Sequence, residues 1–268
     1  MYRKMMVLVL ALVPALSLIC GAQGIEPVAD AYVRGGSYTD TNYGTAGSLV
    51  LKNANNDFNR KVYFRFEVSG PVSEASIEFT VATNNQGGGG STPQTFTVQV
   101  YGLAESLDDA WTEAEITWNN APGNDTANHE FTADATMLGS FIVDETPNGG
   151  SVSFSDPNLV RFINNDTDNQ ITLMLRRTAG TSSSHNLVFA SKEHANYTPA
   201  QMTVRVANRA SGANPADEAS DVPRDVVLDW MPGMFAETHD LYFGTSFEDV
   251  NTATVPTAAA LDVNAFDV

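Results

Sequence analysis

The chain has 268 residues, 43% of them hydrophobic, and carries 14 Lys and Arg against 32 Asp and Glu, a formal net charge of −18. This length accommodates one medium domain with a remainder, or two small domains, and is enough to bury a core. The negative charge disfavours nucleic acid and anionic membranes as partners. The single cysteine, Cys20, excludes an internal disulfide and a cysteine-based zinc site.

Residues 1–24 have the pattern of a secretory signal peptide. Two basic residues precede an apolar run of 13 residues, Val7–Ile19, and Ala22-Gln23-Gly24 is a small-x-small cleavage site. A transmembrane anchor is the alternative, but Pro14 interrupts the run, which is shorter than the roughly 20 residues of a spanning helix. We therefore expect a secreted protein, extracellular or at the cell surface, without membrane contact after cleavage.

Residues 25–208 contain short runs of alternating apolar and polar residues, separated by clusters rich in Gly, Asn, Ser and Thr. This alternation is typical of strands that bury one face. The expected strands are Ala29–Arg34, Ser48–Asn53, Lys61–Val68, Ala75–Ala82, Thr95–Tyr101, Ser151–Phe154, Ile171–Arg177, Leu187–Ser191 and Met202–Val206. One helix is expected, within Asp156–Asn164. The pattern predicts an all-β protein, a β-sandwich of the jelly-roll kind.

The C-terminal part differs in composition. Residues 209–220 are predicted to be a linker, and residues 221–268 contain two further strand-like runs. The segments Val222–Trp230 and His239–Ser246 are similar to the start of a fibronectin- or immunoglobulin-like repeat in large bacterial exported proteins. Since such a sandwich needs about 100 residues, we expect a short, incomplete second β-domain, with further catalytic or surface modules on a longer chain.

The basic residues of the main region fall into two blocks. Residues 66–160 contain no Lys or Arg and 14 acids, whereas residues 26–65 carry five bases against four acids, and residues 161–210 carry six against three. If the first and last strands pair in one sheet, with Ala29, Ala31 and Val33 turned inward, bases and tyrosines share one open face. That face would present Tyr32, Arg34, Lys52, Lys61, Tyr63, Arg65 and Arg176.

This predicted face has the chemistry of a binding site for an acidic polysaccharide. Guanidinium and ammonium groups bind carboxylates, and tyrosine rings cover the apolar faces of sugars. The alternative is that the same bases form ordinary surface salt bridges with acids such as Asp30 and Glu193.

Several motifs occur in a fixed order along residues 26–208. They are Asp30-Ala31-Tyr32-Val33-Arg34, Thr41-Asn42-Tyr43-Gly44, Asn59–Phe66, Trp111-Thr112-Glu113, Ile116–Pro122, Leu175-Arg176-Arg177 and Phe189-Ala190-Ser191-Lys192-Glu193. Together they resemble the DNRLRE-type domain, also classed as carbohydrate-binding module family 96, although the hexapeptide DNRLRE itself is absent. The resemblance implies a secreted β-sandwich that binds glycans, in some members alginate. Six bases lie inside the motifs: Arg34, Arg60, Lys61, Arg65, Arg176 and Lys192.

The leading hypothesis is a non-catalytic module that attaches a larger exported protein to an acidic, alginate-like polysaccharide. The candidate carbohydrate-binding residues are Tyr32, Arg34, Lys52, Lys61, Tyr63, Arg65, Arg176 and Lys192. A structural spacer or adhesion module of a bacterial surface protein, without a glycan site, is one alternative. A polysaccharide lyase is another, with Tyr63 as base beside Arg65. No nucleophile elbow, Walker loop, HExxH motif or dinucleotide fingerprint occurs, and we expect no enzyme activity.

No cofactor is expected, with structural calcium as the one exception. Residues 164–169 (NNDTDN) place oxygen-bearing side chains at alternate positions, as calcium loops do, but lack the glycine turn and the distal glutamate. A solvated β-turn is therefore the alternative for this segment. Asp30 and Asn42 form a second candidate calcium site.

Overall fold

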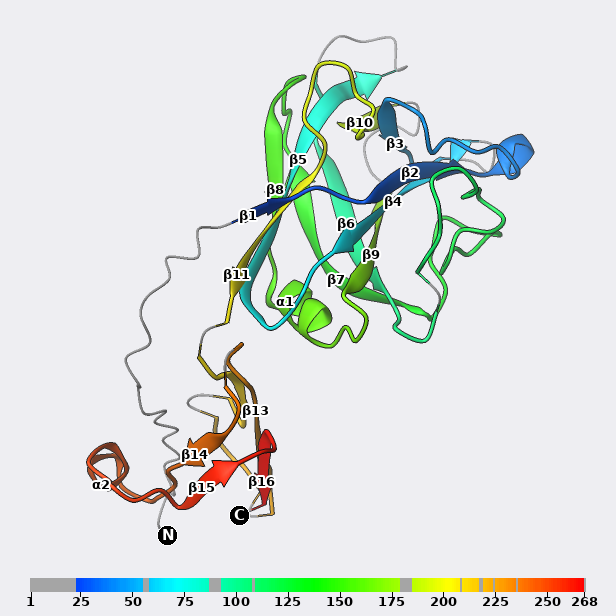
Figure 1. The fold of residues 1–268 in the computed structure, drawn as a ribbon. Helices are drawn as coiled ribbons and strands as arrows, with labels where there is room; N and C mark the ends of the chain where they lie inside the picture. Colours follow the sequence, from blue (N-terminus) through cyan, green and yellow to red (C-terminus); the bar gives the residue numbers. More distant parts are fainter. Residues whose placement is uncertain are drawn as a thin grey trace. The chain divides into compact units, whose positions relative to one another are not determined.

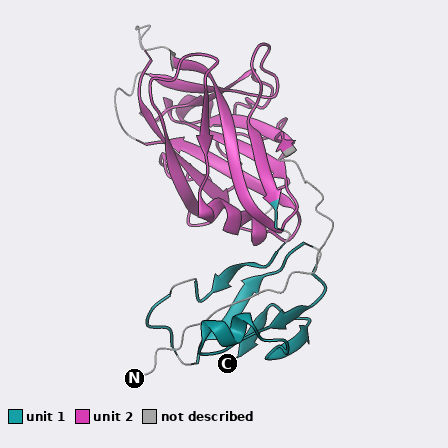
Figure 2. Cartoon of the chain, turned by 90° about the vertical axis from the view of Figure 1, so that its left-hand side faces the viewer, with its two compact units in different colours: residues 1–21, 206–268 teal, residues 22–205 magenta. Residues whose placement is uncertain are grey.

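The computed structural model of the chain describes residues 23–54, 58–86, 93–107, 109–178, 185–207, 209–216, 219–223, 225–234 and 236–267. The chain divides into two compact units, residues 22–205 and residues 1–21 with 206–268 (Figure 2). The predicted signal peptide lies outside the described residues except for Gln23 and Gly24. Within the described ranges, no helix is long and apolar enough to cross a membrane.

Residues 22–205 form a sandwich of two antiparallel sheets (Figure 1). Sheet I has the order β1-β11-β5-β10-β3, with β8 paired to β5; its strands are β1 (Gln23–Ile25), β3 (Ser48–Leu51), β5 (Val72–Gln86), β8 (Ser151–Phe154), β10 (Asn186–Ala190) and β11 (Gln201–Val206). Sheet II has the order β2-β4-β9-β6-β7; its strands are β2 (Ala29–Arg34), β4 (Arg60–Glu67), β6 (Phe96–Leu103), β7 (Ala135–Val143) and β9 (Gln170–Arg177). The predicted all-β sandwich is confirmed.

The main core lies between the two sheets. Alternation on β4 turns Val62, Phe64 and Phe66 inward, and all three are fully buried. Phe79 from sheet I contacts Phe64, with ring centroids 5.6 Å apart. Each such buried side chain stabilises the fold by about 1.5–3 kcal/mol, so this aromatic layer holds the sheets together without a disulfide.

Strand β7 escapes the sequence analysis because a bulge breaks its alternation. Its pairing with β6 shifts register between Val100 and Tyr101, which oppose Gly139 and Met137. Leu138 is skipped in the ladder and is buried together with Phe141 and Val143. The buried residues are thus three and then two positions apart, which is neither a strict strand period nor a helical one.

The single helix of this unit, α1 (Pro157–Asn164), agrees with the expected helix within Asp156–Asn164. The side chain of Asp156 caps it by accepting a hydrogen bond from the Asn158 backbone N–H at 2.8 Å. At the other end, the Asn164 side chain accepts from the Val72 N–H at 2.7 Å and donates to the Val72 carbonyl at 2.9 Å. This pair of bonds fastens the helix to the start of β5.

Residues 206–268 form a small β unit of their own. Its strands are β12 (Ser211–Asn214), β13 (Val227–Met231) and β16 (Ala265–Asp267) in one sheet, and β14 (His239–Leu241) and β15 (Ala258–Leu261) in another, with the short helix α2 (Phe247–Asn251). Leu228, Trp230 and Leu241 are its buried core. Part of the predicted linker, residues 211–214, is strand β12 and pairs with β13.

The Asn164 clamp gives a first prediction. Asn164→Ala removes both hydrogen bonds to Val72 and leaves a partly buried peptide unit unsatisfied, so the free energy of unfolding falls by about 2 kcal/mol. Urea denaturation measures this loss. The matched control is Asn165→Ala, an exposed residue at the helix end, which leaves the midpoint within experimental error. Equal midpoints for the two variants would contradict the clamp.

Candidate functional site

The outer face of sheet II, predicted to be open, is covered. The connection between β6 and β7, residues 104–134, lies across it and is called the covering loop here (Figure 1, green). A second apolar cluster joins the two: Ala31, Val33, Tyr63 and Met174 from the sheet, with Leu103, Ile116, Trp118 and Ala121. Both faces of sheet II are therefore buried along β2, β4 and β9.

Lys61 points outward as predicted, but it is completely buried under the covering loop. Its ammonium donates hydrogen bonds to the side-chain oxygen of Asn124 at 2.6 Å and to the backbone carbonyls of Asp125, Asn128 and Glu130. The ring of Trp118 lies 4.5 Å from the same nitrogen. Burial lowers the pKa of Lys61 to about 7. The predicted exposure of Lys61 is wrong, because the loop backbone takes up its charge.

Tyr63 and Arg65, also on the outer face, are held by the same loop. Tyr63 is fully buried, with its ring edge-on to Trp111 and Phe131. Arg65 is half-buried and donates from Nη1 to the Trp111 carbonyl at 2.6 Å. The predicted exposure of Tyr63 is therefore wrong, and Tyr63 cannot reach a polymer as the base of a lyase.

Arg176 on β9 lies on the outer face as predicted, at the rim of the covering loop. Its guanidinium forms an ion pair with Glu130 at 2.5 Å, and only 12% of its side chain is exposed. Its Nε also donates to the Tyr101 hydroxyl at 3.3 Å. Here the alternative of salt bridging describes the geometry better than an open cationic face.

The predicted orientation of β2 is wrong. Tyr32 pairs with Val62 and Arg34 pairs with Arg60, so Tyr32 and Arg34 share the face of β4 that contains Val62. Ala31 and Val33 instead lie beneath the covering loop. The error arises because both faces are buried, so that the small apolar residues of β2 mark the loop side and not the sandwich interior.

The predicted pairing of the Lys52 strand with the basic sheet is also wrong in part. Strand β3, which precedes Lys52, belongs to sheet I and pairs with β10. Lys52 itself forms an isolated antiparallel bridge to Arg60 of sheet II. Lys52 thus lies at the edge where the two sheets meet.

At this edge the structure gathers cations and rings into one cluster. We call it the cationic edge; it consists of Arg34, Tyr38, Lys52, Phe58 and Arg60. The guanidinium of Arg34 lies 3.4 Å from the Tyr38 ring centroid and 5.7 Å from that of Phe58, and the Lys52 ammonium lies 5.1 Å from Phe58. The two rings are exposed, Tyr38 at 38% and Phe58 at 47%.

The cations of this edge are close enough to disfavour one another's charge. Burial, followed by repulsion from Arg60, Arg177 and Arg34, lowers the pKa of Lys52. Burial and the positive charge of Arg34 likewise lower the pKa of Arg60. An anion placed here would relieve this repulsion. Tyr32 lies behind the edge and stacks on Tyr43, with centroids 4.4 Å apart.

A groove of about 220 Å³ adjoins the cationic edge in sequence. Its lining residues are Gly35, Gly36, Thr39, Asn59, Trp118, Thr126 and Ala127. Gly35 and Gly36 directly follow Arg34, Asn59 directly precedes Arg60, and the Gly35 N–H donates to the Asn59 carbonyl at 3.0 Å. The groove has the polar lining and aromatic component common in sugar sites.

Lys192, the last predicted site residue, lies apart from the cationic edge residues in a different set of contacts. Its ammonium binds Glu113 Oε1 at 2.8 Å and the Val28 carbonyl at 3.0 Å. Its backbone N–H donates to the buried carboxylate of Asp30 at 2.9 Å.

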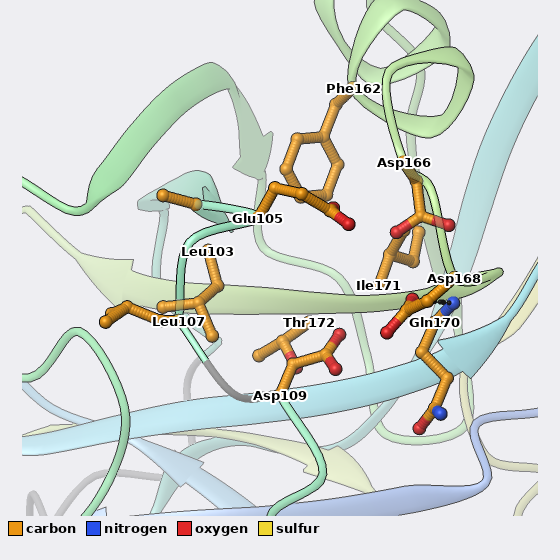
Figure 3. A pocket seen from close by; sticks show the side chains of 11 residues that line it. Leu103, Glu105, Leu107, Asp109, Phe162, Asp166, Asp168, Gln170, Ile171 and Thr172 are labelled. Carbon is orange, nitrogen blue, oxygen red and sulfur yellow. Dashed lines mark hydrogen bonds between the residues drawn. The ribbon is translucent and has the colours of Figure 1, made fainter.

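A small acidic pocket of about 20 Å³ lies between the end of β6 and the turn after α1 (Figure 3). Glu105, Asp166 and Asp168 have carboxylate oxygens within 4.8 Å of one another. Burial, then repulsion from neighbouring acids, raises the pKa of Asp166 to about 6. The predicted calcium segment 164–169 contributes two of these acids, whereas Asn164 is engaged with Val72.

The sequence analysis does not identify Tyr38, Phe58 or Glu113 as site residues. Tyr38 follows a glycine pair in the short 3₁₀ helix η1 (Gly36–Tyr38), and Phe58 ends a polar loop. A bulky aromatic within such a turn cluster is the available signal, since loops place their side chains at the surface.

Comparison with known families gives one match. The sequence model of carbohydrate-binding module family 96 matches residues 22–205, which is most of the chain and coincides with the sandwich unit. A search of curated proteins finds no match.

The burial of Lys61 predicts a structural role for its ammonium. Lys61→Met keeps the length of the side chain but leaves the oxygens of the covering loop without their donor, so the free energy of unfolding falls by about 3 kcal/mol. Chemical denaturation checks this value. Arg205→Met, which removes an exposed base paired with Glu74, is the control and changes stability by less than about 1 kcal/mol. A Lys61 variant as stable as the control would contradict the assigned role.

The acidic pocket predicts a pH dependence. Asp166 has a folded-state pKa above its ordinary value of 3.8, so its contribution to stability is present below about pH 4 and is lost as the pH rises through 6. Asp168→Asn keeps the side-chain oxygen that accepts from Gln170 but removes one repelling charge. The pKa of Asp166 therefore falls, and ¹³C carboxyl NMR titration measures the shift. An unchanged pKa would contradict the coupling.

Proposed function

Since the chain belongs to carbohydrate-binding module family 96, we propose that residues 22–205 bind an acidic polysaccharide, of which alginate is one example, at the cationic edge. The observation that carries the proposal is the grouping of three cations with two exposed rings in a chain with a net charge of −18. In this assignment the edge binds uronate carboxylates, and the adjoining groove holds neighbouring sugar rings.

The chemistry of the edge supports an anionic ligand with flat apolar faces. Arg34 and Arg60 can each present two parallel N–H groups to a carboxylate, which a lysine cannot do. Tyr38 and Phe58 offer exposed ring surface for the C–H face of a sugar. Because Arg34 lies over Tyr38, its guanidinium is already ordered and loses less conformational entropy on binding.

The overall negative charge does not oppose such binding at ordinary ionic strength. The Debye length is about 8 Å at 0.15 M salt, so acids on distant parts of the surface are largely screened from a polymer at the edge. The local cations then dominate the attraction. Binding should weaken as salt rises, because the same screening acts on the exposed cations.

We further propose that the module is secreted and non-catalytic and acts by retention. A single shallow edge gives modest affinity, and a second binding or catalytic module on a longer chain would raise the overall retention through effective concentration. The lyase alternative is disfavoured by the complete burial of Tyr63, its assigned base.

One observation favours a spacer as the second candidate function. Lys61, Arg65, Arg176 and Lys192 all contact oxygens of the protein itself, as expected for bases that hold the fold. A spacer would show no retention on any of a broad panel of glycans, neutral or acidic, whereas the proposed module is retained by uronate polymers.

The test is affinity electrophoresis of the chain in gels containing alginate. The double variant Arg34→Ala with Arg60→Ala is expected to raise the apparent Kd at least about tenfold, because two carboxylate contacts are lost. Raising NaCl from about 50 to 500 mM should weaken the parent in the same direction.

The matched control is Arg161→Ala with Arg205→Ala, which removes the same charge from two exposed positions outside the edge. It should retain the affinity of the parent. If the edge variant binds as well as this control, the assigned edge is wrong; if the parent ignores every uronate polymer but binds a neutral glycan, the acidic ligand is wrong.

A further inference from the structure

The most unusual carboxylate of the molecule is Asp30 on β2. Its side chain is fully buried, and Oδ2 accepts a hydrogen bond from the Lys192 backbone N–H at 2.9 Å. Oδ1 is also buried but has no hydrogen-bond partner in the described part of the chain. A buried carboxylate oxygen without a partner is costly and calls for an unseen positive or donor group.

Two further carboxylates lie around Asp30. Glu113 Oε1 accepts from the Asp30 backbone N–H and from the Lys192 ammonium, each at 2.8 Å. Glu193 is adjacent to Lys192, and its charge together with that of Glu113 adds to burial in raising the pKa of Asp30 to about 7. Three carboxylates against one ammonium leave two uncompensated negative charges.

The loop of residues 42–47 fixes both acid-bearing segments around Asp30. The Asn42 amide donates to the Glu113 carbonyl at 2.6 Å, and a Cβ at Gly44 would lie 1.8 Å from that carbonyl oxygen. On the other side, Ser191 Oγ donates to the Ala46 carbonyl at 2.7 Å. Four segments far apart in the sequence are thus held together by backbone contacts before any ligand arrives.

We propose that Asp30, Glu113 and Glu193 bind a calcium ion, with Asp30 Oδ1 as the central ligand. Calcium takes six to eight oxygen ligands and favours carboxylates combined with backbone carbonyls and water. Oxygen is the donor atom here, as a hard divalent cation requires. The ion compensates the two excess negative charges and satisfies the orphan oxygen. Lys192 remains on Glu113 Oε1, and Oδ1 of Asp30 faces the ion.

The acidic pocket at Glu105, Asp166 and Asp168 is the internal comparison for this site. Its carboxylates are exposed or half-buried, and among the described residues none of them has a buried oxygen without a partner. It therefore carries no proposal, but it would bind the same ion weakly if charge alone sufficed.

The experiment measures calcium binding by the full chain, without polysaccharide, by isothermal titration after removal of divalent ions. Terbium luminescence, excited through tryptophan such as Trp111 near Glu113, is the second readout. We expect one site per chain, a higher Tm with calcium, and at least about a tenfold weaker affinity in Asp30→Asn. Glu193→Gln, at an exposed side chain, weakens binding without the risk of unfolding.

The control is Asp168→Asn, which should leave the calcium affinity unchanged. Asp30→Asn also separates the ion from a purely structural carboxylate, because without calcium it removes an uncompensated charge and melts no lower than the parent, whereas with calcium the parent melts higher. The assignment is overturned if the parent binds no calcium, if Asp168→Asn abolishes the binding, or if Glu193→Gln and Asp30→Asn both bind as the parent does. Alginate retention is measured separately, so failure here leaves the cationic edge untouched.

Discussion

The architecture of the sandwich unit depends on one buried ammonium. The covering loop has almost no regular secondary structure, so its backbone carbonyls need donors from elsewhere. Lys61 supplies them from the middle of β4, with Asn124, Asp125, Asn128 and Glu130 oxygens around a single nitrogen. By closing the loop over sheet II, this cation removes the broad outer face as a binding surface and leaves the sheet edge available to a ligand.

The fold was predictable from the sequence because it depends on local alternation and turn chemistry. The outward positions of Lys61, Tyr63, Arg65 and Arg176 also follow from that alternation. What lies over them does not, because a strand buried on both faces and a strand buried on one face can carry the same small apolar residues, as Ala31 and Val33 show. Sheet membership of β3 depends on long-range pairing, which local sequence does not encode.

The candidate site was only partly predictable for a related reason. Arg34 and Lys52 stand out as bases, but their association with Tyr38 and Phe58 depends on two loops meeting at the junction of the sheets. Many of the motif residues prove to be architectural: Lys61 anchors a loop, and Lys192 with Glu113 encloses Asp30. The resemblance therefore identifies the family more directly than it identifies ligand contacts.

The buried state of Lys61 makes the loop's motions measurable. An amine with a pKa near 7 is largely uncharged at slightly alkaline pH and hence intrinsically nucleophilic, yet here it is completely shielded from solvent. Acylating reagents can modify it only during excursions in which residues 104–134 lift away. The rate of its modification, followed by mass spectrometry, would report how often this lid opens and how far ligands or ions slow it.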